Sequence, residues 1–294
     1  MSVVCFGEIL WDLLPGGKVA GGAPMNVAFH LRNFGLSPKL VSRVGADALG
    51  QELQAFLTEK GLTTALLQTG QEAPTSTVQV TLDEAGHASY EIVAPVAWDY
   101  IALRTDNRSA VREADAIVFG SLASRSAATR ATLLELLEEE RPLKVFDVNL
   151  RPPHYSKALL ETLLAKADIV KMNEEELDII SSWYGLYAGE PAKMEELRQR
   201  FGLQGLLLTK GGDGAAWMGK DSSYIEQPAF DIKVADTVGS GDSFLAAFLS
   251  QYLAGFPLPQ ALEFAAATGA LVATFQGGTP SVFAADVNRF RKMH

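Results

Sequence analysis

The stretch Asp236-Thr237-Val238-Gly239-Ser240-Gly241-Asp242 leads directly into an apolar run that ends near Leu253. Large apolar residues in this run recur at helical spacing, at Phe244, Leu245, Phe248, Leu249, Tyr252 and Leu253. This spacing predicts one buried face of a helix over residues 243–254. Gly255 and Pro257 then provide the usual signals for a helix end. Two glycines and a carboxylate therefore stand in the turn that opens a buried helix.

This turn has the features of an anion site. A helix N-terminus offers free backbone N–H groups and the positive end of the helix dipole, and both attract phosphate. The Asp242 carboxylate would repel an anion there unless it has another role, such as accepting the proton of an attacking hydroxyl as a general base. The structural alternative is that Asp242 or Ser240 caps the helix and that the glycines only shape the turn. This stretch alone leaves both interpretations open.

Composition indicates a globular protein with a large core. The chain has 294 residues, of which 48% are hydrophobic and 20% charged. No linker, low-complexity tract or repeat divides it, so we predict a single domain over residues 1–294. The formal net charge of -10 argues against nucleic acid or an anionic membrane as a partner. The lone cysteine, Cys5, and the lack of a signal-peptide pattern lead us to expect a cytoplasmic protein.

Apolar strands and amphipathic helices alternate along most of the chain. Strands are predicted at residues 3–6, 39–44, 116–119, 144–148, 169–172 and 206–209, with two short strands around turns at 215–218 and 224–227. Helices are predicted at 24–34, 49–60, 127–139, 157–166, 174–182, 191–201, 258–275 and 284–292. This order is typical of an α/β fold with a mostly parallel sheet covered on both faces. Ligands bind at the carboxyl ends of such strands. The residues at those predicted ends are Gly7, Gly120, Asn149, Asn173 and Lys210.

One segment breaks this pattern. Residues 76–82 alternate polar and apolar side chains, which is typical of a sheet with one wet face. Glu84-Ala85-Gly86 is predicted to be a turn into a second strand at 87–93. Because a half-wet hairpin does not belong inside a parallel core sheet, we expect it to cover a site.

Several well-known chemical motifs are missing. No Walker A, H-E-x-x-H or G-x-S-x-G sequence is present. Gly239-x-Gly241 lacks the third glycine of a dinucleotide fingerprint, which counts against a nicotinamide-dependent dehydrogenase. The four histidines are scattered, which disfavours a zinc site. A metal would more readily be Mg²⁺ carried by nucleotide phosphates.

Four stretches together resemble the ribokinase/PfkB family of carbohydrate kinases. Gly21-Gly22-Ala23-Pro24-Met25-Asn26-Val27-Ala28 and the stretch 236–242 are similar to its two signatures. Asn173-Glu174-Glu175-Glu176 resembles its N-x-x-E motif, and Thr209-Lys210-Gly211-Gly212-Asp213-Gly214 resembles its nucleotide-site motif. The four lie in family order and span most of the chain. Gly-Gly-Ala-Pro and Phe146-Asp147-Val148-Asn149-Leu150-Arg151 are most similar to the fructokinase branch, and Ala23 replaces the usual lysine of ribokinases.

The resemblance implies a ribokinase-like fold and a kinase reaction. A small β lid would be formed by segments at about 9–18 and 76–97, and pairing of lids between subunits would give a homodimer. The reaction would transfer the γ-phosphoryl group of ATP to a primary hydroxyl of a sugar, with fructose as the expected acceptor and fructose phosphate and ADP as products.

The same resemblance implies the roles of the site residues. Asp242 would be the general base, and the N–H groups of Gly239, Ser240 and Gly241 would form an anion hole. The sugar would be bound by Asp12, Gly21, Gly22, Asn26, Asn149 and Arg151. The nucleotide would be bound by Asn173, Glu176, Thr209, Lys210, Gly211 and Gly214. Glu176 would reach Mg²⁺ through water, and Asp236 and Val238 would help to hold K⁺.

Some alternatives stay open on the residues alone. Asp12 could be a solvated strand residue, Asn173 a helix cap, and Arg151 half of a surface ion pair. The acceptor could instead be 2-keto-3-deoxygluconate, ribose or a nucleoside. A regulator that binds sugar or nucleotide without catalysis is a further alternative, although a pure binding protein would have no need of Asp242 as a base.

Overall fold

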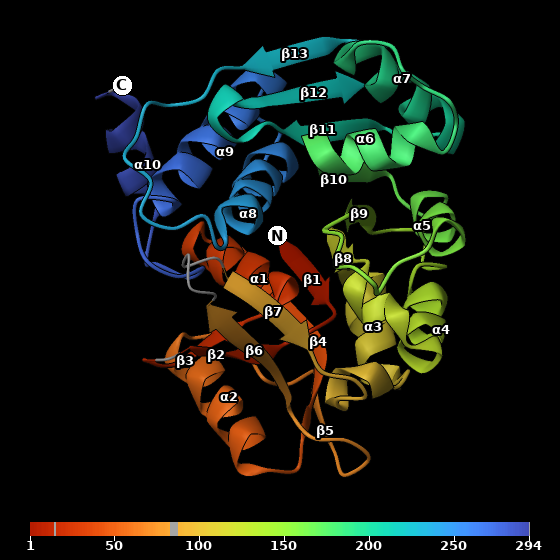
Figure 1. The fold of residues 1–294 in the computed structure, drawn as a ribbon, viewed down its shortest axis with the longest axis vertical. Helices are drawn as coiled ribbons and strands as arrows, with labels where there is room; N and C mark the ends of the chain where they lie inside the picture. Colours follow the sequence, from red (N-terminus) through yellow and green to blue (C-terminus); the bar gives the residue numbers. More distant parts are fainter. Residues whose placement is uncertain (15, 83–87, 294) are drawn as a thin grey trace.

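The computed structural model describes residues 1–14, 16–82 and 88–293, and its centre is a nine-stranded sheet (Figure 1). The strand order is β13-β12-β11-β10-β9-β8-β1-β4-β5. All neighbours in this sheet pair in parallel except β11 with β12 and β12 with β13. The mostly parallel sheet predicted from the sequence is confirmed. The strands are β1 (Ser2–Phe6), β4 (Ser37–Gly45), β5 (Leu67–Gly70), β8 (Ala116–Gly120), β9 (Leu143–Asp147), β10 (Ile169–Asn173), β11 (Gly205–Thr209), β12 (Ala215–Gly219) and β13 (Tyr224–Gln227).

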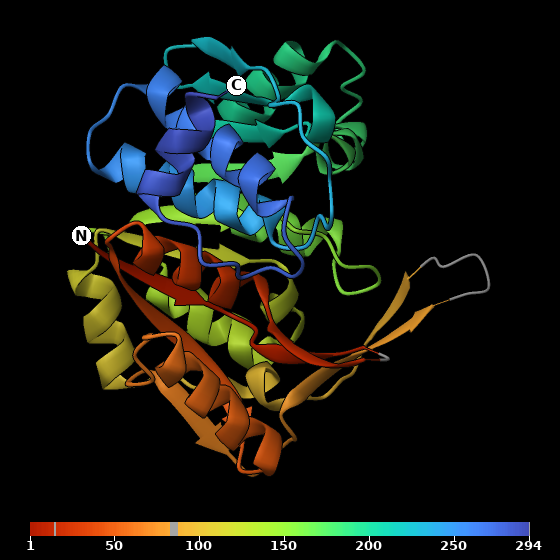
Figure 2. The ribbon, with the colours of Figure 1, turned by 90° about the vertical axis from the view of Figure 1, so that its left-hand side faces the viewer.

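Helices cover both faces of this sheet (Figure 2). One face carries α1 (Ala23–Asn33), α2 (Ala48–Glu59), α8 (Ser240–Leu253), α9 (Leu258–Val272) and α10 (Ala284–Arg291). The other carries α3 (Thr105–Glu113), α4 (Ala127–Leu136), α5 (Lys157–Leu164), α6 (Glu174–Ser182) and α7 (Glu190–Phe201). Short 3-10 turns lie at η1 (Ala97–Tyr100), η2 (Leu122–Arg125) and η3 (Gly211–Asp213). In the part of the chain that the structure describes, every helix is too short or too polar to cross a membrane.

Strand β1 shows why the sheet is buried on both sides. Its side chains point alternately to opposite faces, as they do in any strand. Val3 and Cys5 join the core beneath α1 and α8, whereas Val4 and Phe6 join the core beneath α3 and α4. An uninterrupted apolar run is therefore what this central position requires.

A second, smaller sheet stands apart from the main one, in the order β3-β2-β6-β7. It consists of β2 (Leu10–Leu14), β3 (Gly17–Gly21), β6 (Ser76–Leu82) and β7 (Ala88–Ile92). Figure 2 shows β6 and β7 projecting from the body of the molecule. Their antiparallel pairing confirms the predicted hairpin, while the predicted turn at 84–86 lies outside the described residues. Leu10 and Val78 are buried together at its base, with Ile92 packed against them.

Some predicted boundaries were wrong. Helix α8 begins at Ser240 instead of residue 243, so Ser240, Gly241 and Asp242 form its first turn. Helices α4 and α9 end at Leu136 and Val272, a few residues before their predicted ends. Strands β3 and β5 and helix α3 were not predicted at all.

Candidate active site

A cavity of about 870 Å³ lies where the N-termini of α1 and α8 meet the carboxyl ends of the parallel strands and the small sheet. Most of the site residues predicted from the sequence line it, namely Asp12, Gly21, Gly22, Asn26, Asn149, Arg151, Asn173, Thr209, Gly211, Gly214, Val238, Gly239, Ser240, Gly241 and Asp242. Glu176, Lys210 and Asp236 are not part of its lining. The fold thus gathers most of the predicted residues around one space.

The first turn of α8 forms one wall of the cavity. Gly239 precedes the helix in the left-handed conformation, with φ 74°, and a Cβ atom there would collide with the backbone of Gly278. The Ser240 hydroxyl donates to the Gly269 carbonyl at 3.1 Å, and the backbone N–H of Ser240 donates to the Thr237 carbonyl at 3.2 Å. The Ser240 N–H, which the resemblance assigned to the anion hole, is therefore already used within the turn. Helix geometry leaves the N–H groups of Gly241 and Asp242 without intrahelical acceptors, so these donors are available to an anion.

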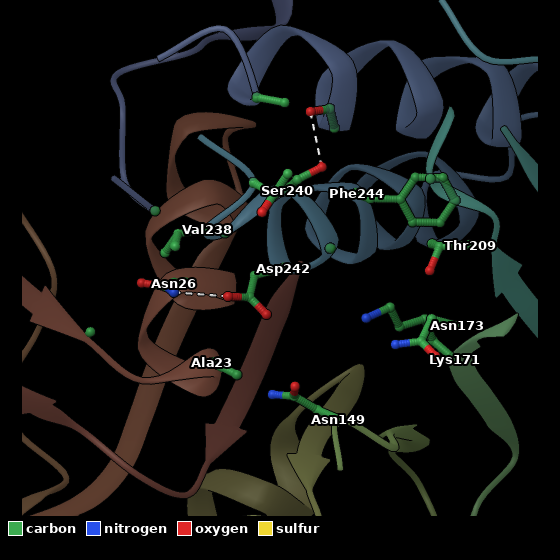
Figure 3. Close-up of a pocket in the computed structure, with 18 of the residues that line it drawn as sticks. Ala23, Asn26, Asn149, Lys171, Asn173, Thr209, Val238, Ser240, Asp242 and Phe244 are labelled. Atoms are coloured by element: carbon green, nitrogen blue, oxygen red, sulfur yellow. Dashed lines mark hydrogen bonds between the residues drawn. The ribbon is translucent and has the colours of Figure 1, made fainter. Parts of the chain in front are cut away.

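Asp242 does not cap this helix, so the capping interpretation is wrong. The α8 N-terminus has no side-chain cap, and the Asp242 carboxylate instead accepts a hydrogen bond from Asn26 Nδ2 at 2.8 Å (Figure 3). The pKa of Asp242 is raised to about 6, first by burial and then by the nearby Asp147 carboxylate, while Lys171, Asn26 and Arg151 oppose the shift. A carboxyl group with a pKa of about 6 is ionised at neutral pH and still basic enough to accept a proton.

A buried ion pair lies next to the first turn of α8. Lys171 on β10 donates to Asp147 at the end of β9, with Nζ 3.0 Å from Oδ1. A Cβ atom built on Gly241 would lie 3.1 Å from Lys171 Nζ, so the ammonium group is against the helix terminus. Burial lowers the pKa of Lys171, but the Asp147, Glu176 and Asp242 carboxylates outweigh burial and raise it. The ammonium group therefore stays charged beside the anion site.

The loop that opens α1 forms the opposite wall. Gly22 precedes the helix with φ 114°, and a Cβ atom there would collide with the Glu8 carbonyl. Gly21 lies equally close to β2, since its Cβ would be 2.6 Å from Asp12 Oδ2. Burial raises the pKa of Asp12 to about 6, although Arg151 lowers it. Only glycines let this loop approach the Asp12 carboxylate so closely.

Asn149 and Arg151 enter the cavity from the loop after β9. Asn149 has φ 39°, an uncommon backbone conformation for a residue other than glycine. Its carbonyl accepts a hydrogen bond from the Ser121 hydroxyl at 3.4 Å. Arg151 lines the cavity and lowers the pKa values of Asp12 and Asp242. The loop therefore brings a cation to the carboxylates.

The residues Asn173 and Glu176 form a capping box at the start of α6. Asn173 Oδ1 accepts from the Glu176 N–H at 2.8 Å, and Glu176 Oε2 accepts from the Asn173 N–H at 2.9 Å. The other Glu176 oxygen accepts from the Leu150 N–H at 2.8 Å. Both oxygens of Glu176 are thus used by the backbone. Among the neighbours in the motif, Glu174 and Glu175 line the cavity instead.

The loop after β11 approaches the cavity through its backbone. Thr209, Gly211 and Gly214 line the space, and a Cβ atom on Gly214 would collide with the Gln227 carbonyl. The Lys210 ammonium group instead pairs with Glu226 at 2.8 Å and with Glu190 at 3.4 Å. In this arrangement Lys210 holds strand β13 and helix α7 together, away from the cavity lining.

Asp236 connects the two loops next to the α8 terminus. Its carboxylate accepts from the Val238 N–H at 3.0 Å and from the Gly277 N–H at 2.9 Å. The adjacent Gly278 carbonyl lies 2.9 Å from the Nε2 atom of the buried His30. The side chain of Asp236 thus fixes the backbone of both loops.

Glu8, Asp147 and Lys171 belong to the charged cluster of this site and were not predicted from the sequence as site residues. Glu8 is 3% exposed and lines the cavity at the end of β1. Asp147 was quoted only as part of a family motif. The one available signal was position, because Asp147 and Lys171 lie at or next to the carboxyl ends of neighbouring parallel strands.

Comparison with known proteins agrees with this geometry. Residues 15–284 match the model of the family described as pfkB family carbohydrate kinase. The fructokinase of Klebsiella pneumoniae is 30% identical over 292 residues, which cover 92% of each chain. Fructokinase-1 of Oryza sativa subsp. japonica is 28% identical over 310 residues, which cover 95% of this chain and 94% of the relative.

Solved structures give the same result. A fructokinase from Xylella fastidiosa with bound ATP superposes with a TM-score of 0.88 at 26% identity, over 99% of this chain and 98% of that one. A putative Ribokinase II from E. coli superposes at 0.87 with 18% identity, over 100% and 99% of the chains, which shows the common fold. The chain therefore belongs to the pfkB family of carbohydrate kinases and is an ATP-dependent sugar kinase.

Proposed function

We propose that this kinase phosphorylates fructose on a primary hydroxyl, with Asp242 as the general base. The observation that carries the proposal is the 2.8 Å hydrogen bond between Asn26 and Asp242. It joins the first turn of α1, where the resemblance places the sugar, to the first turn of α8, where an anion would bind. The fructokinase relatives support fructose as the acceptor.

The chemistry is a single displacement. The Asp242 carboxylate accepts the proton of the attacking hydroxyl, whose oxygen bonds to the γ-phosphorus of ATP as the bond to the bridging oxygen breaks and ADP leaves. The N–H groups of Gly241 and Asp242 and the Lys171 ammonium group stabilise the charge on the transferring group. Asn26 holds the carboxylate toward the acceptor, so that both reactants meet at the end of α8.

The nucleotide would occupy the other end of the cavity. Phe244, Ala266, Ala270 and Ala273 give that end an apolar lining suited to an adenine ring, next to the loop of Thr209 and Gly211. Ala266, rather than a polar residue, faces this space, so stacking and main-chain contacts would hold the base.

The donor sets fit the proposed cations. Glu174 and Glu175 line the cavity beside Asn173, and carboxylate oxygens are donors that suit Mg²⁺. The described residues contain no group of three or more acidic, histidine or cysteine ligands, so ATP phosphates and water would complete its shell. Mg²⁺ would neutralise phosphate charge. The backbone carbonyls of the loops that Asp236 joins would hold K⁺.

The small sheet would act as a lid over the sugar. Leu10, Val78 and Ile92 lie at its base and line the cavity, so closure would exclude water and limit ATP hydrolysis. Leu14, Val19 and Val93 are 43%, 39% and 37% exposed on or next to its strands. These side chains support a homodimer formed through the lid, which sedimentation of the purified protein would test.

The acceptor is tested with a panel of substrates in an ATP-consumption assay. Fructose is expected to have the highest kcat/KM among fructose, glucose, ribose, 2-keto-3-deoxygluconate and a nucleoside. The sugar acid is expected to be poor because Glu8, Asp12 and Asp242 place three carboxyl groups around the acceptor end. A preference for the sugar acid or the nucleoside over every neutral sugar would refute the assignment.

A further inference from the structure

The carboxyl group of Glu8 has no evident structural role. The residue lies just past the end of β1, is 3% exposed and lines the cavity. Its backbone carbonyl packs against the Gly22 loop. Within the described residues, Glu8 Oε2 has no hydrogen-bond partner. A buried polar atom without a partner costs stability, so such atoms are rare unless a ligand or water completes them.

Glu176 provides a contrast within the same site. It is also a nearly buried glutamate, 5% exposed, but its two oxygens accept hydrogen bonds from the Leu150 and Asn173 N–H groups. Through those contacts the Glu176 side chain positions the backbone at Leu150 and Asn173. Glu8 instead lines the cavity that the acceptor occupies under the proposed function and keeps one oxygen without a partner among the described residues, so we assign the missing partner to the acceptor.

The charges that face Glu8 decide its protonation. The charged groups that act on it are Arg151 from the loop after β9, Asp242 from α8 and Asp147 from β9, and its own backbone N–H also donates to the carboxyl group. Burial is the largest cause that raises the pKa of Glu8, and the two aspartates add to the rise. The Glu8 N–H and Arg151 lower it, and the net pKa is about 7. Since the pKa of Asp242 is about 6, Asp242 ionises first and Glu8 keeps its proton over part of the neutral range.

A protonated carboxyl group matches a sugar hydroxyl. It has one O–H donor and a carbonyl acceptor, and a hydroxyl likewise donates one hydrogen bond and accepts others. A second ionised carboxylate beside Asp242 would be disfavoured by like-charge repulsion. Two neighbouring carboxyl groups can thus hold different protonation states and different tasks.

We propose that Glu8 is a sugar-binding residue, which exchanges hydrogen bonds with a hydroxyl of the acceptor other than the one that is phosphorylated. This inference rests on the proposed function, because it takes the acceptor to be a neutral sugar. It assigns to Glu8 a role in affinity for the sugar and none in the affinity for ATP.

The test compares Glu8→Ala with Glu8→Gln, whose amide also offers both a donor and an acceptor. Glu8→Ala is expected to raise the fructose KM on the order of 10-fold, with the ATP KM within about twofold of wild type. Glu8→Gln is expected to restore most of the affinity. In wild type the fructose KM is expected to rise as pH passes about 7, because Glu8 then loses its donor, and Glu8→Gln should lack this rise.

Thermal unfolding provides a readout that does not depend on turnover. Because Glu8 Oε2 has no partner in the part of the chain that the structure describes, the free Glu8→Ala protein is expected to melt at or above the wild-type temperature. The stabilisation by added fructose should shrink, while that by ADP should persist. A lower melting temperature together with a raised ATP KM would show that Glu8 is structural and overturn the inference.

The remaining outcomes separate this inference from the proposed function. If the wild-type protein turns over fructose and Glu8→Ala leaves the fructose KM unchanged, the inference alone is wrong. It is also wrong if Glu8→Gln loses as much affinity as Glu8→Ala. If the wild-type protein phosphorylates no neutral sugar, the proposed function itself fails.

Discussion

The side chain of Asp242 sits between two opposing electrostatic demands. A general base must be ionised at the working pH, yet an anion must bind beside it. The structure meets both demands with Lys171, which pairs with Asp147 and also lies against Gly241. The pair leaves Asp242 with a pKa of about 6, raised by burial more than by any single charge.

Replacing Asp242 with asparagine should separate catalysis from stability. We expect Asp242→Asn to lower kcat by about 10²–10⁴-fold with little change in the ATP KM, because only the proton acceptor is lost. A folded-state pKa raised to about 6 means that this carboxyl group destabilises the fold as pH rises from about 4 to above 6. The free energy of unfolding of the variant should therefore exceed that of wild type by about 3 kcal/mol at pH 8 and scarcely differ from it at pH 4. Near-normal turnover would remove Asp242 from the mechanism.

The Lys171–Asp147 pair permits a double-variant test. Lys171→Met should lower the free energy of unfolding by about 3–5 kcal/mol, because Asp147 is left buried and unpaired. It should also lower kcat, because the ammonium group beside the phosphoryl site is gone. Adding Asp147→Asn to Lys171→Met should restore most of the free energy of unfolding, as measured with urea. The kcat of this double variant should stay low. Recovery of both in the double variant would contradict a direct role for Lys171.

The residues that sequence reasoning missed depend on partners from distant strands. Asp242 stands in a recognisable glycine turn, so its place in the cavity lining could be predicted. Lys171 precedes the N-x-x-E motif and reads as an ordinary strand residue, because its partner Asp147 lies on another strand. Conversely, the sequence could not show that Lys210 pairs with Glu190 and Glu226.

Helix α8 is the element on which the site depends. Both of its ends carry a glycine with positive φ, 74° at Gly239 and 78° at Gly255. Only Gly239 is also held against another backbone, since a Cβ atom there would collide with Gly278 whereas one on Gly255 meets nothing within 4 Å. The two ends therefore offer a matched comparison.

We expect Gly239→Ala to damage both stability and activity, and Gly255→Ala to affect stability alone. An alanine at either position carries the left-handed strain of about 1 kcal/mol. At Gly239 the collision also displaces the α8 terminus from the loop at Gly278, so kcat should fall by about 10²-fold or more. Gly255→Ala should keep the wild-type kcat with a slightly lower melting temperature. Equal kcat values for the two variants would show that the position of this turn does not matter.

The elements that could be predicted are those with a clear apolar period. The run behind Gly239 predicts α8, and β1 was found from four apolar residues between polar ends. Strand β3 was not predicted because residues 17–21 include two glycines and a lysine and become a strand only by pairing with β2. Helix α3 was not predicted because its sequence is mostly polar and buries little beyond Asn107, Ala110 and Val111.

At the scale of the molecule, the topology brings distant segments together. Asn26 and Asp242 are 216 residues apart in sequence and 2.8 Å apart in space, because α1 and α8 pack side by side on one face of the sheet (Figure 1). No local pattern contains this contact. It could be anticipated only through the resemblance to a family, which supplies the fold together with its motifs.

The overall charge leads to a prediction about salt. The chain carries a net charge of -10, and the cavity presents Glu8, Asp12, Asp242, Glu174 and Glu175 against Arg151 and Lys171. Under the proposed function, backbone N–H groups, one buried ammonium group and a divalent cation would hold the polyanionic nucleotide against a repulsive long-range field. Salt screens that field more than it screens the buried contacts.

Raising the ionic strength from 0.01 to 0.15 M with a non-coordinating salt, at saturating Mg²⁺, should leave the ATP KM unchanged or lower it. Chelating Mg²⁺ should reduce kcat/KM by about 100-fold or more, since it removes the main counter-charge of the phosphates. Steady-state kinetics at fixed pH measures both effects. A steep rise of the ATP KM with salt would mean that exposed lysines and arginines attract the nucleotide, contrary to the charge distribution of this site.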